Sequence, residues 1–443
     1  MGRRKPAKGR ERFLGLLVIL LLSFIFTQLF DFKRIEVSTN LNQSDVNASV
    51  QATERRAPPD VAWDFPPEWL ANIHDSMYHF TKDEKVSISS SGLNKAYDSL
   101  RHGLFIRVEN NTAFAKAKTV YGTPWETDFD AGLVSTFFCR MYFVICSLDL
   151  DTDIDFIYSH ADEPVGYSHK PYPAFSWVKS DTSTDLLVPY GETWGGPLRH
   201  RDKHCKTDIN DTLWDERIHK GVWRGSNTGV RTNVDWKSAP RAQLVTICNT
   251  FPDICDAGFT QYVNGRLDQI QEMKNTLGIV DMLHSEEQDR FKYAIVPDGN
   301  SAPSSRMKSH LESESLTMKQ KSIFKEFFYD SLVPYVHYLP LSEDFHDLVD
   351  KISWARKNDK FVRDMVRHAR VFACKWFNSN TIHSYLMSVF KEYVKRFNGI
   401  QATNIKTSDM IRIKINSLEE LEKTCALSRY DFKDKSCRIL TAP

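Results

Sequence analysis

Short apolar runs and helical periodicities alternate along most of the chain. The runs with strand character lie at residues 134–145, 155–159, 220–225, 292–297 and 315–320. Apolar residues at helical spacing mark residues 240–251, 306–311 and, as the longest pattern, 344–377. This alternation predicts an α/β protein with parallel sheets, and the length beyond the N-terminal region suits two such domains.

Residues 13–30 (FLGLLVILLLSFIFTQLF) form an apolar run without charge. A helix of this length spans about 27 Å, close to the hydrocarbon core of a bilayer. The main alternative is a cleaved signal peptide, whose apolar region usually has about 7–15 residues and ends at small residues. Because the run is longer and its end, TQLFDFKR (27–34), offers no small-x-small cleavage site, we expect an uncleaved transmembrane signal anchor. The basic tail, residues 1–12, then lies in the cytoplasm by the positive-inside rule, and the body faces the secretory lumen.

Residues 31–62 are poor in hydrophobic residues and rich in Ser, Asn, Thr and charge, which predicts a flexible lumenal stem. Four sequons fit the lumenal side: Asn42, Asn47, Asn110 and Asn210. The chain has eight cysteines, and the close pairs Cys139/Cys146 and Cys248/Cys255 suit disulfides in an oxidising compartment. Buried free thiols remain an alternative for Cys205 and Cys374.

Composition excludes several classes of protein. Hydrophobic residues make up 41% and charged residues 26% of the chain, as in ordinary globular proteins. The net charge is +1, and the first 30 residues carry six bases and one acid, so the rest of the chain is net acidic. No basic domain remains to bind a phosphate backbone, and we expect no nucleic-acid partner.

Residues 292–320 carry the most informative pattern, which is a strand, a glycine-containing loop, a helix and a strand. Ser304 or Ser305 can cap the helix, which places Arg306 in its first turn. A helix N-terminus binds anions, whereas a cation in the first turn is unfavourable unless an anion such as a diphosphate lies in front of it. The alternative is that Arg306 pairs with a surface carboxylate.

A second pattern places Arg224, Gly225 and Ser226 at the C-terminal end of an apolar strand. A guanidinium followed by glycine and a hydroxyl can hold phosphate oxygens, and open α/β sheets bind ligands at this edge. An ordinary surface turn is the alternative.

Acidic residues alternate before and along the strand at 155–159, at Asp149, Asp151, Asp153 and Asp155, and Asp162 follows it. An Asp-x-Asp pair can hold Mn²⁺ or Mg²⁺ against a nucleotide diphosphate. Asp162 alone can instead act as a general base for a hydroxyl. A solvated acidic strand edge is the alternative for at least two of the four upstream aspartates. The motifs GxSxG, HExxH, GxGxxG and the Walker loop are absent from the sequence.

Taken together and in order, these stretches resemble glycosyltransferase family 90, the Rumi-like protein O-glucosyltransferase and capsule-associated-protein family. The segments that carry the resemblance are DIDFIYSHADEP (153–164), PAFSWVKS (173–180), ETWGGP (192–197), VWRGSNTG (222–229), KYAIVPDGNSAPSSRMK (292–308), residues 315–341 and WARKND (354–359).

The resemblance implies a GT-B fold, in which two Rossmann-like domains face a cleft. The acceptor-side domain with the catalytic aspartate would be residues 63–200, the UDP-sugar donor domain 201–375, and the C-terminal helices and tail 376–443. It also implies an inverting transfer from UDP-glucose or UDP-xylose that needs no metal and no other cofactor.

Carried over position by position, Asp162 matches the catalytic base. Arg224 and Arg306 match the arginines that face the donor diphosphate, with Gly225 and Ser226 beside them. The remaining donor-binding positions implied are Asp298, Gly299 and Ser301 in the donor loop, and Glu326, on the following helix, for the ribose hydroxyls. Two fixed arginines and a helix N-terminus can stabilise departing UDP without a metal, which makes Asp151 and Asp153 structural.

Three features depart from the Rumi-like pattern. Asn227 stands where such members often carry a second arginine, and the stretch between Thr228 and Pro240 is longer. The anchor and the C-terminal ILTAP also differ from a soluble enzyme with a KDEL-type end. The sequence therefore predicts a single-pass type II transferase of the Golgi or endoplasmic reticulum membrane, acting on a glycoprotein serine or a glycan. The alternatives are a non-catalytic sugar-binding or scaffold protein on a decayed transferase fold, and a metal-dependent GT-A transferase using Asp151 and Asp153.

Overall fold

The computed structural model describes part of the compact unit Thr53–Pro443. The described residues are 65–78, 80, 88–110, 112–118, 153–166, 172–190, 207, 209, 211–397 and 405–412. The expected tail, anchor and stem, the expected strand at 134–145 and the segment 192–197 lie outside them. None of the helices in this part of the chain has the length and apolar character needed to cross a membrane.

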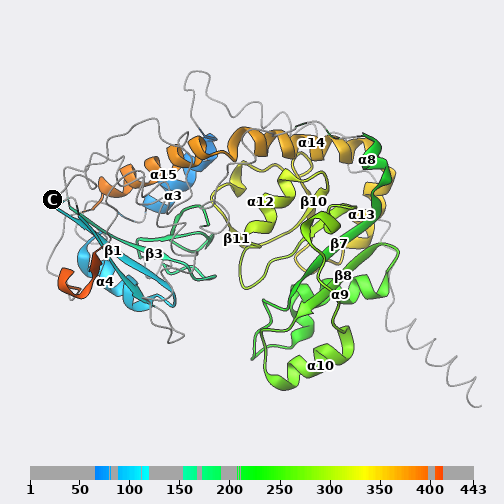
Figure 1. The fold of residues 1–443 in the computed structure, drawn as a ribbon, viewed down its shortest axis with the longest axis horizontal. Helices are drawn as coiled ribbons and strands as arrows, with labels where there is room; N and C mark the ends of the chain where they lie inside the picture. The colour runs from blue at the N-terminus through cyan, green and yellow to red at the C-terminus, as the bar shows by residue number, and fades with distance from the viewer. Residues whose placement is uncertain are drawn as a thin grey trace, which may run out of the picture. The chain divides into compact units, whose positions relative to one another are not determined.

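A parallel sheet of five strands has the order β12-β10-β9-β7-β8. Figure 1 labels β7, β8 and β10 of this sheet. Its strands are β7 (Ile218–Ser226), β8 (Cys255–Gln261), β9 (Phe291–Val296), β10 (Leu316–Gln320) and β12 (Leu339–Leu341). This confirms the strands predicted at 220–225, 292–297 and 315–320. The first strand, β7, lies between the second and the third, so the winding reverses between β7 and β9. In doubly wound sheets such a reversal opens a crevice at the carboxyl ends of the two strands.

Helices alternate with these strands along the chain. They are α8 (Asp211–Glu216), α9 (Pro240–Thr250), α10 (Leu267–Leu277), α11 (Ser285–Gln288), α12 (Ser305–Glu312), α13 (Leu348–Lys357) and α14 (Asp359–Trp376). The helices predicted at 240–251 and 306–311 are confirmed by α9 and α12. Short 3₁₀ turns occupy η2 (Trp236–Ser238), η3 (Tyr329–Ser331) and η4 (Thr407–Asp409).

The long helix predicted at 344–377 is wrong as a single element, because α13 ends and α14 begins at Asn358. The Asn358 side-chain amide donates to the Trp354 carbonyl oxygen at 2.8 Å. An asparagine side chain that donates to a helix carbonyl oxygen competes with the backbone hydrogen bonds of the helix and favours a break in it.

The second large sheet has six strands in the order β13-β2-β1-β3-β4-β6. Its strands are β1 (Gly103–Glu109), β2 (Thr112–Lys118), β3 (Ile154–Ser159), β4 (Ala174–Ser176), β6 (Leu186–Leu187) and β13 (Ile411–Arg412). β3, β4 and β6 run parallel, whereas β13, β2, β1 and β3 pair antiparallel. The expectation of a parallel sheet is therefore wrong for β13, β2 and β1 of this sheet. Its β1–β2 connection is a tight turn at Asn110 (φ 47°), which is too short for a parallel crossover.

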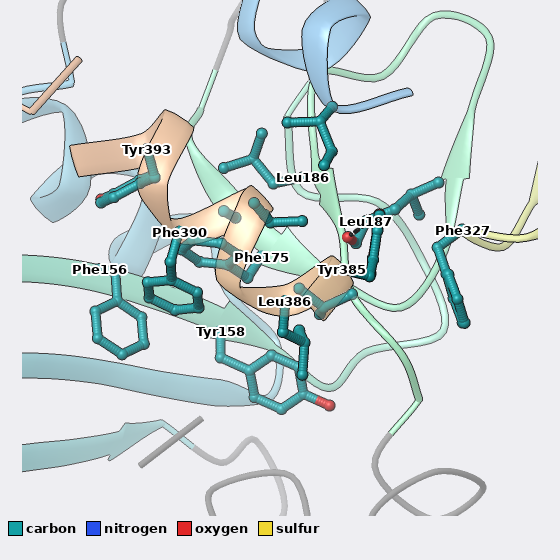
Figure 2. Close-up of a cluster of buried hydrophobic side chains, with 14 of the residues drawn as sticks. Phe156, Tyr158, Phe175, Leu186, Leu187, Phe327, Tyr385, Leu386, Phe390 and Tyr393 are labelled. Atoms are coloured by element: carbon teal, nitrogen blue, oxygen red, sulfur yellow. Dashed lines mark hydrogen bonds between the residues drawn. The ribbon is translucent and has the colours of Figure 1, made fainter. Parts of the chain in front are cut away.

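Helices α3 (Pro67–Tyr78), α4 (Ser90–Ser99) and α15 (Ser379–Val394) contribute to the core of the six-stranded sheet, and residues of α12 and α14 join the same cluster. On α15, the Phe390 ring stacks on Phe175 with centroids 4.7 Å apart (Figure 2). The hydroxyl groups of Tyr385 and Tyr393 donate to the carbonyl oxygens of Leu187 and Asp155, at 2.8 and 2.7 Å. Helix α15, late in the chain, thus completes the core of a sheet built mainly from earlier residues. A short ladder also joins β5 (Lys179–Ser180) to β11 (Phe324–Lys325).

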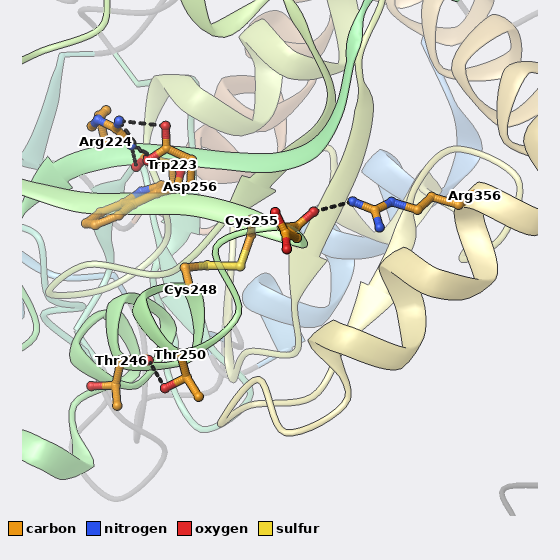
Figure 3. Close-up of a disulfide and its surroundings, with 9 residues drawn as sticks. Trp223, Arg224, Thr246, Cys248, Thr250, Cys255, Asp256 and Arg356 are labelled. Carbon is orange, nitrogen blue, oxygen red and sulfur yellow. Dashed lines mark hydrogen bonds and ion pairs between the residues drawn. A yellow bond between two sulfur atoms is a disulfide. The ribbon is translucent and has the colours of Figure 1, made fainter.

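A disulfide joins Cys248, in the last turn of α9, to Cys255, the first residue of β8 (Figure 3). This confirms one of the two expected close pairs. Cys374 is disulfide-bonded as well, so the free-thiol alternative is wrong for it. Cys139, Cys146 and Cys205 lie outside the described residues.

Candidate functional site

A cavity of about 550 Å³ opens where β7 and β9 end. Most of the candidate residues meet there: Asp162, Arg224, Gly225, Ser226, Gly299, Ser301 and Arg306. Asp162 lies in the loop after β3 of the six-stranded sheet, and the others lie at the end of β7 or in the segment after β9 of the five-stranded sheet. The volume lies within the range of small-molecule and cofactor sites, and the position is the crevice expected from the reversed strand order.

Arg224 extends from β7 but is already paired. Its guanidinium lies 2.8 Å from the Asp256 carboxylate on β8 and donates to the carbonyl oxygens of Trp223 and Asp256, both at 3.1 Å (Figure 3). Its positive charge at the cavity is therefore largely balanced by a neighbouring strand.

Arg306 and Arg241 carry the unbalanced charge of the cavity. Both guanidinium groups lie over the Trp223 ring, at 5.9 and 5.3 Å from its centroid. Arg306 donates to the Arg224 carbonyl oxygen at 2.5 Å, and Arg241 to those of Asp298 and Ser226 at 2.7 and 3.0 Å. Within the described part of the chain, neither forms an ion pair with a carboxylate.

Desolvation acts on both of these groups. Burial and the nearby Arg306 lower the pKa of Arg241 to about 9, and burial alone lowers the pKa of Arg306. Two desolvated cations held by carbonyl oxygens favour a multiply charged anion, because guanidinium–phosphate hydrogen bonds are charge-assisted.

The loop between β9 and α12 lines the same cavity. At Gly299, a Cβ atom would lie 2.8 Å from the Arg241 Nη2 atom, so a larger residue would displace that guanidinium. The Ser301 side chain is buried, and its hydroxyl has no hydrogen-bond partner among the described residues. Ser304 takes the N-cap position of α12 with φ 51°, as one of the two expected candidates, but its hydroxyl makes no capping bond. The loop therefore presents hydroxyl groups and a helix N-terminus to a ligand.

Two candidates have side chains that do not line the cavity. The Asp298 carboxyl accepts a hydrogen bond from the Ser322 hydroxyl, and burial raises the pKa of Asp298 to about 6. Glu326 is buried, accepts from the Tyr329 hydroxyl at 3.0 Å, and has a pKa that burial raises to about 8. The helix expected at Glu326 is wrong, because the residue follows strand β11 directly. Asp298 contributes its backbone carbonyl to Arg241, and the ribose role of Glu326 stays a prediction.

Asp162 lies in the loop after β3, and that loop is fixed on both sides of it. The Trp177 indole donates to the Ala161 carbonyl oxygen at 3.0 Å. The buried Asp185 carboxylate accepts from the backbone N–H groups of Val165 and Gly166, both at 2.9 Å. Burial raises the pKa of Asp185 to about 7. The Asp162 side chain itself is exposed and lines the cavity, and the loop backbone that carries it is held in place.

The aspartates upstream have other partners. Asp155 makes a buried bidentate ion pair with Arg107 on the neighbouring strand, at 2.7 Å. Asp153 accepts from the Asn110 backbone N–H at 2.8 Å and so holds the β1–β2 turn. Asp149 and Asp151 lie outside the described residues, and within those no group of three or more possible metal ligands occurs. The expectation of a metal-free site stays a prediction.

Sequence reasoning missed several residues of the cavity. Arg241 could have been found, because it follows Pro240 at the start of α9 and so repeats the first-turn cation seen at Arg306. Trp177, Tyr190 and Asn300 also line the cavity, and no local pattern marks them.

Asn227, the departure noted above, is buried and points away from the cavity. It donates to the Asn264 carbonyl oxygen at 2.6 Å, and it accepts from the N–H groups of Val263 and Asn264 at 2.6 and 3.0 Å. Its side chain therefore anchors the loop after β8. The arginines that line the cavity are Arg224, Arg241 and Arg306.

The fold and the cavity define an α/β protein with a crevice lined by three arginines at the ends of parallel strands. The model of glycosyl transferase family 90 matches residues 137–437, and the chain belongs to this family.

Relatives of known name are distant. Protein O-glucosyltransferase 2 of Danio rerio is 25% identical over 293 residues, which are 64% of this chain and 54% of that protein. Protein O-glucosyltransferase 3 of Homo sapiens is 25% identical over 258 residues, covering 55% of this chain and 47% of that protein. O-glucosyltransferase rumi of Drosophila melanogaster is 26% identical over 241 residues, covering 50% and 54%. The chain spans about half the length of the curated relatives it matches.

Proposed function

We propose that this chain is an inverting glycosyltransferase that moves glucose or xylose from a UDP-sugar to a hydroxyl group of a protein serine or a glycan. One observation carries the proposal. A single cavity combines two arginines that have no carboxylate partner in the described part of the chain with a fixed, exposed carboxylate, Asp162, from the other sheet. Family membership and relatives named as protein O-glucosyltransferases support the reaction class and favour a protein acceptor.

In the proposed reaction, the diphosphate binds in front of Arg241, Arg306 and the N-terminus of α12. Asp162 accepts the proton of the acceptor hydroxyl while its oxygen attacks the anomeric carbon from the face opposite UDP. The new carbon–oxygen bond forms as the bond to the diphosphate breaks, and UDP leaves with the electron pair. The fixed guanidinium groups and helix N–H groups stabilise the charge that develops on UDP, so no metal is required.

The donor sugar and the compartment come from the sequence. UDP-glucose and UDP-xylose are the donors that the resemblance implies. The apolar run at 13–30 and the bases before it support a membrane-anchored enzyme of the Golgi or endoplasmic reticulum with a lumenal body.

The test is release of UDP by the full-length chain from UDP-glucose, UDP-xylose, UDP-galactose or UDP-N-acetylglucosamine, with and without EDTA. Asp162→Asn should reduce turnover at least about 100-fold and keep UDP binding, because the amide cannot take the proton. Asp181→Asn, which changes an exposed aspartate that does not line the cavity, is the matched control and should keep full activity.

Each outcome has a distinct meaning. EDTA-resistant turnover of one donor, lost in Asp162→Asn only, identifies the sugar and supports the metal-free mechanism. Full activity of Asp162→Asn refutes the base assignment, and loss with EDTA refutes the metal-free mechanism. If no donor is turned over and a titration detects no UDP binding, the proposal is wrong and the non-catalytic alternative stands.

A further inference from the structure

The side chain of Asn300 joins the donor loop to Asp162. Its amide nitrogen donates to one carboxylate oxygen of Asp162 at 3.0 Å. Asn300 is the second residue after Asp298 in the loop that follows β9, whereas Asp162 follows β3 of the other sheet. This hydrogen bond therefore links the loop that lines the arginine-rich cavity with the carboxylate proposed above as the general base.

The orientation of this amide is set by its other partners. The Asn300 side-chain oxygen accepts from the backbone N–H of Gly229 at 3.0 Å and from the side-chain amide of Asn264 at 2.8 Å. A backbone N–H can only donate, so the oxygen of Asn300 must face Gly229 and its NH₂ group must face Asp162. The Asp162 carboxylate can only accept, so its contact requires the same orientation of the Asn300 amide as the contact with Gly229.

Asn300 is itself supported by the residue that departs from the family pattern. Asn227 binds both the N–H and the carbonyl oxygen of Asn264, and the side chain of Asn264 donates to Asn300. Hydrogen bonds thus run from the Asn227 side chain at the end of β7 to the backbone of Asn264, and from the Asn264 side chain through Asn300 to Asp162. Beside this path, Ala302 of the same loop packs in a small buried cluster with Trp177, whose indole holds the Asp162 loop at Ala161.

We propose that Asn300 is a positioning residue for Asp162, which couples the donor loop to the general base. The amide occupies one carboxylate oxygen and leaves the other for the acceptor hydroxyl. Because Asn300 lies between Gly299 and Ser301, which both line the anion site, any ordering of this loop by the donor also orders the base. This inference rests on the proposed function, since it assigns Asp162 the role of base.

Two substitutions separate positioning from mere structural support. Asn300→Ala removes every polar contact of the side chain. Asn300→Asp keeps the oxygen that accepts from Gly229 and Asn264, but replaces the donor to Asp162 with a second carboxylate. A structural role therefore predicts that Asn300→Asp is the more active of the two. Positioning of the base predicts the reverse, because two carboxylates repel each other.

We expect kcat to fall about 10- to 100-fold in Asn300→Ala, and further in Asn300→Asp, because small displacements of a catalytic group have effects of this size. The Kd for UDP should stay within about threefold of the wild-type value in Asn300→Ala, since the residue acts through Asp162 rather than on the diphosphate. Asn275→Ala, which changes an exposed asparagine on α10, is the matched control and should leave kcat unchanged.

A double-mutant cycle measured by urea denaturation tests the contact between Asn300 and Asp162 without an activity assay. Asn300→Asp should lower the urea midpoint of the wild-type chain, and it should raise that of Asp162→Asn. In the double variant Asp162→Asn/Asn300→Asp the donor and the acceptor are exchanged, so the hydrogen bond re-forms. That double variant should recover stability but not turnover, because the carboxylate now lies on the donor loop.

The outcomes distinguish this inference from the proposed function. If the wild type turns over a donor and Asn300→Asp is more active than Asn300→Ala, the inference is overturned while the function stands. If the wild type turns over no donor, the function fails, and the denaturation cycle alone decides whether Asn300 orients Asp162. Additive midpoints in that cycle overturn the inference in either case.

Discussion

Replacing Asn227 by alanine tests whether this position serves the fold or the donor. The side chain is fully buried and binds the loop after β8 through three hydrogen bonds, to the N–H groups of Val263 and Asn264 and to the carbonyl oxygen of Asn264. It does not line the cavity. Asn227→Ala should therefore lower the free energy of unfolding and leave the affinity for UDP nearly unchanged.

The size of the effect follows from how accessible the abandoned groups are. A buried polar group left without a partner costs about 1–3 kcal/mol, so three fully buried groups would cost more than about 3 kcal/mol. Val263 is 53% exposed, however, so water can reach its side of the loop and replace part of the loss. We therefore take a cost of at most about 1 kcal/mol for each of the three groups, and expect Asn227→Ala to lower the free energy of unfolding by about 2–3 kcal/mol.

Urea denaturation of the full-length chain measures this change, with Asn275→Ala as the control at an exposed asparagine. The control should stay within about 0.5 kcal/mol of the wild type, as is usual at surface positions. A UDP titration at low denaturant should give a Kd within about threefold of the wild-type value for both variants. The reasoning is refuted if Asn227→Ala unfolds at the wild-type midpoint but loses UDP binding, because Asn227 would then act on the donor.

Three further predictions concern the anion site, the disulfide and a buried carboxyl. Arg241→Ala and Arg306→Ala should each weaken UDP binding about 10- to 100-fold in a titration, since each removes charge-assisted hydrogen bonds of about 1.5–3 kcal/mol; an unchanged Kd would exclude that arginine from the donor site. Replacing Cys248 and Cys255 together by serine should lower the free energy of unfolding by about 2–3 kcal/mol, because the bond closes a loop with a sequence separation of only 7; an unchanged urea midpoint would contradict this. Burial raises the folded-state pKa of Asp185 to about 7 from 3.8, so the folded state binds more protons between these values and stability falls as pH rises through this window, on the order of 4 kcal/mol in total. Asp185→Asn should lack this part of the pH dependence in urea unfolding between pH 4 and 8, and an unchanged slope would show that this carboxyl is not its source.

The sequence predicted strands β3 and β9, in which all six residues are buried. Both were found although each buries one charged residue, Asp155 in β3 and Lys292 in β9. Strand β1 was not predicted, and it buries Arg107 in its centre. That arginine is tolerated only because Asp155 of β3, 48 residues later in the chain, neutralises it. A partner so distant in sequence cannot be inferred from local pattern.

The site divides in a similar way. Arg306, Arg224 and Gly299 follow from strand ends and a helix start, where local rules predict which groups face a ligand. Local sequence rules do not predict whether a side chain in a turn points into the cavity or away from it. Asp298 turns to Ser322 while its neighbour Gly299 lines the cavity. The contacts of Asn300 require its own loop to meet the three loops that carry Asp162, Gly229 and Asn264, and this is a property of the tertiary structure alone.

The electrostatics of the cavity connect stability with the proposed chemistry. Arg241 and Arg306 are desolvated and held by carbonyl oxygens, which offset their charge less well than a carboxylate would. The ligand-free protein therefore bears a cost that a bound diphosphate relieves, and UDP should raise the unfolding midpoint as mass action requires. A carboxylate partner for each arginine would make the free protein more stable, but it would compete with the diphosphate. The same guanidinium groups are already fixed on Trp223, so they need little rearrangement when charge develops on departing UDP. Among the described residues, neither arginine makes a direct ion pair with a carboxylate, and this leaves both guanidinium groups available for the charge on UDP in the transfer that we propose.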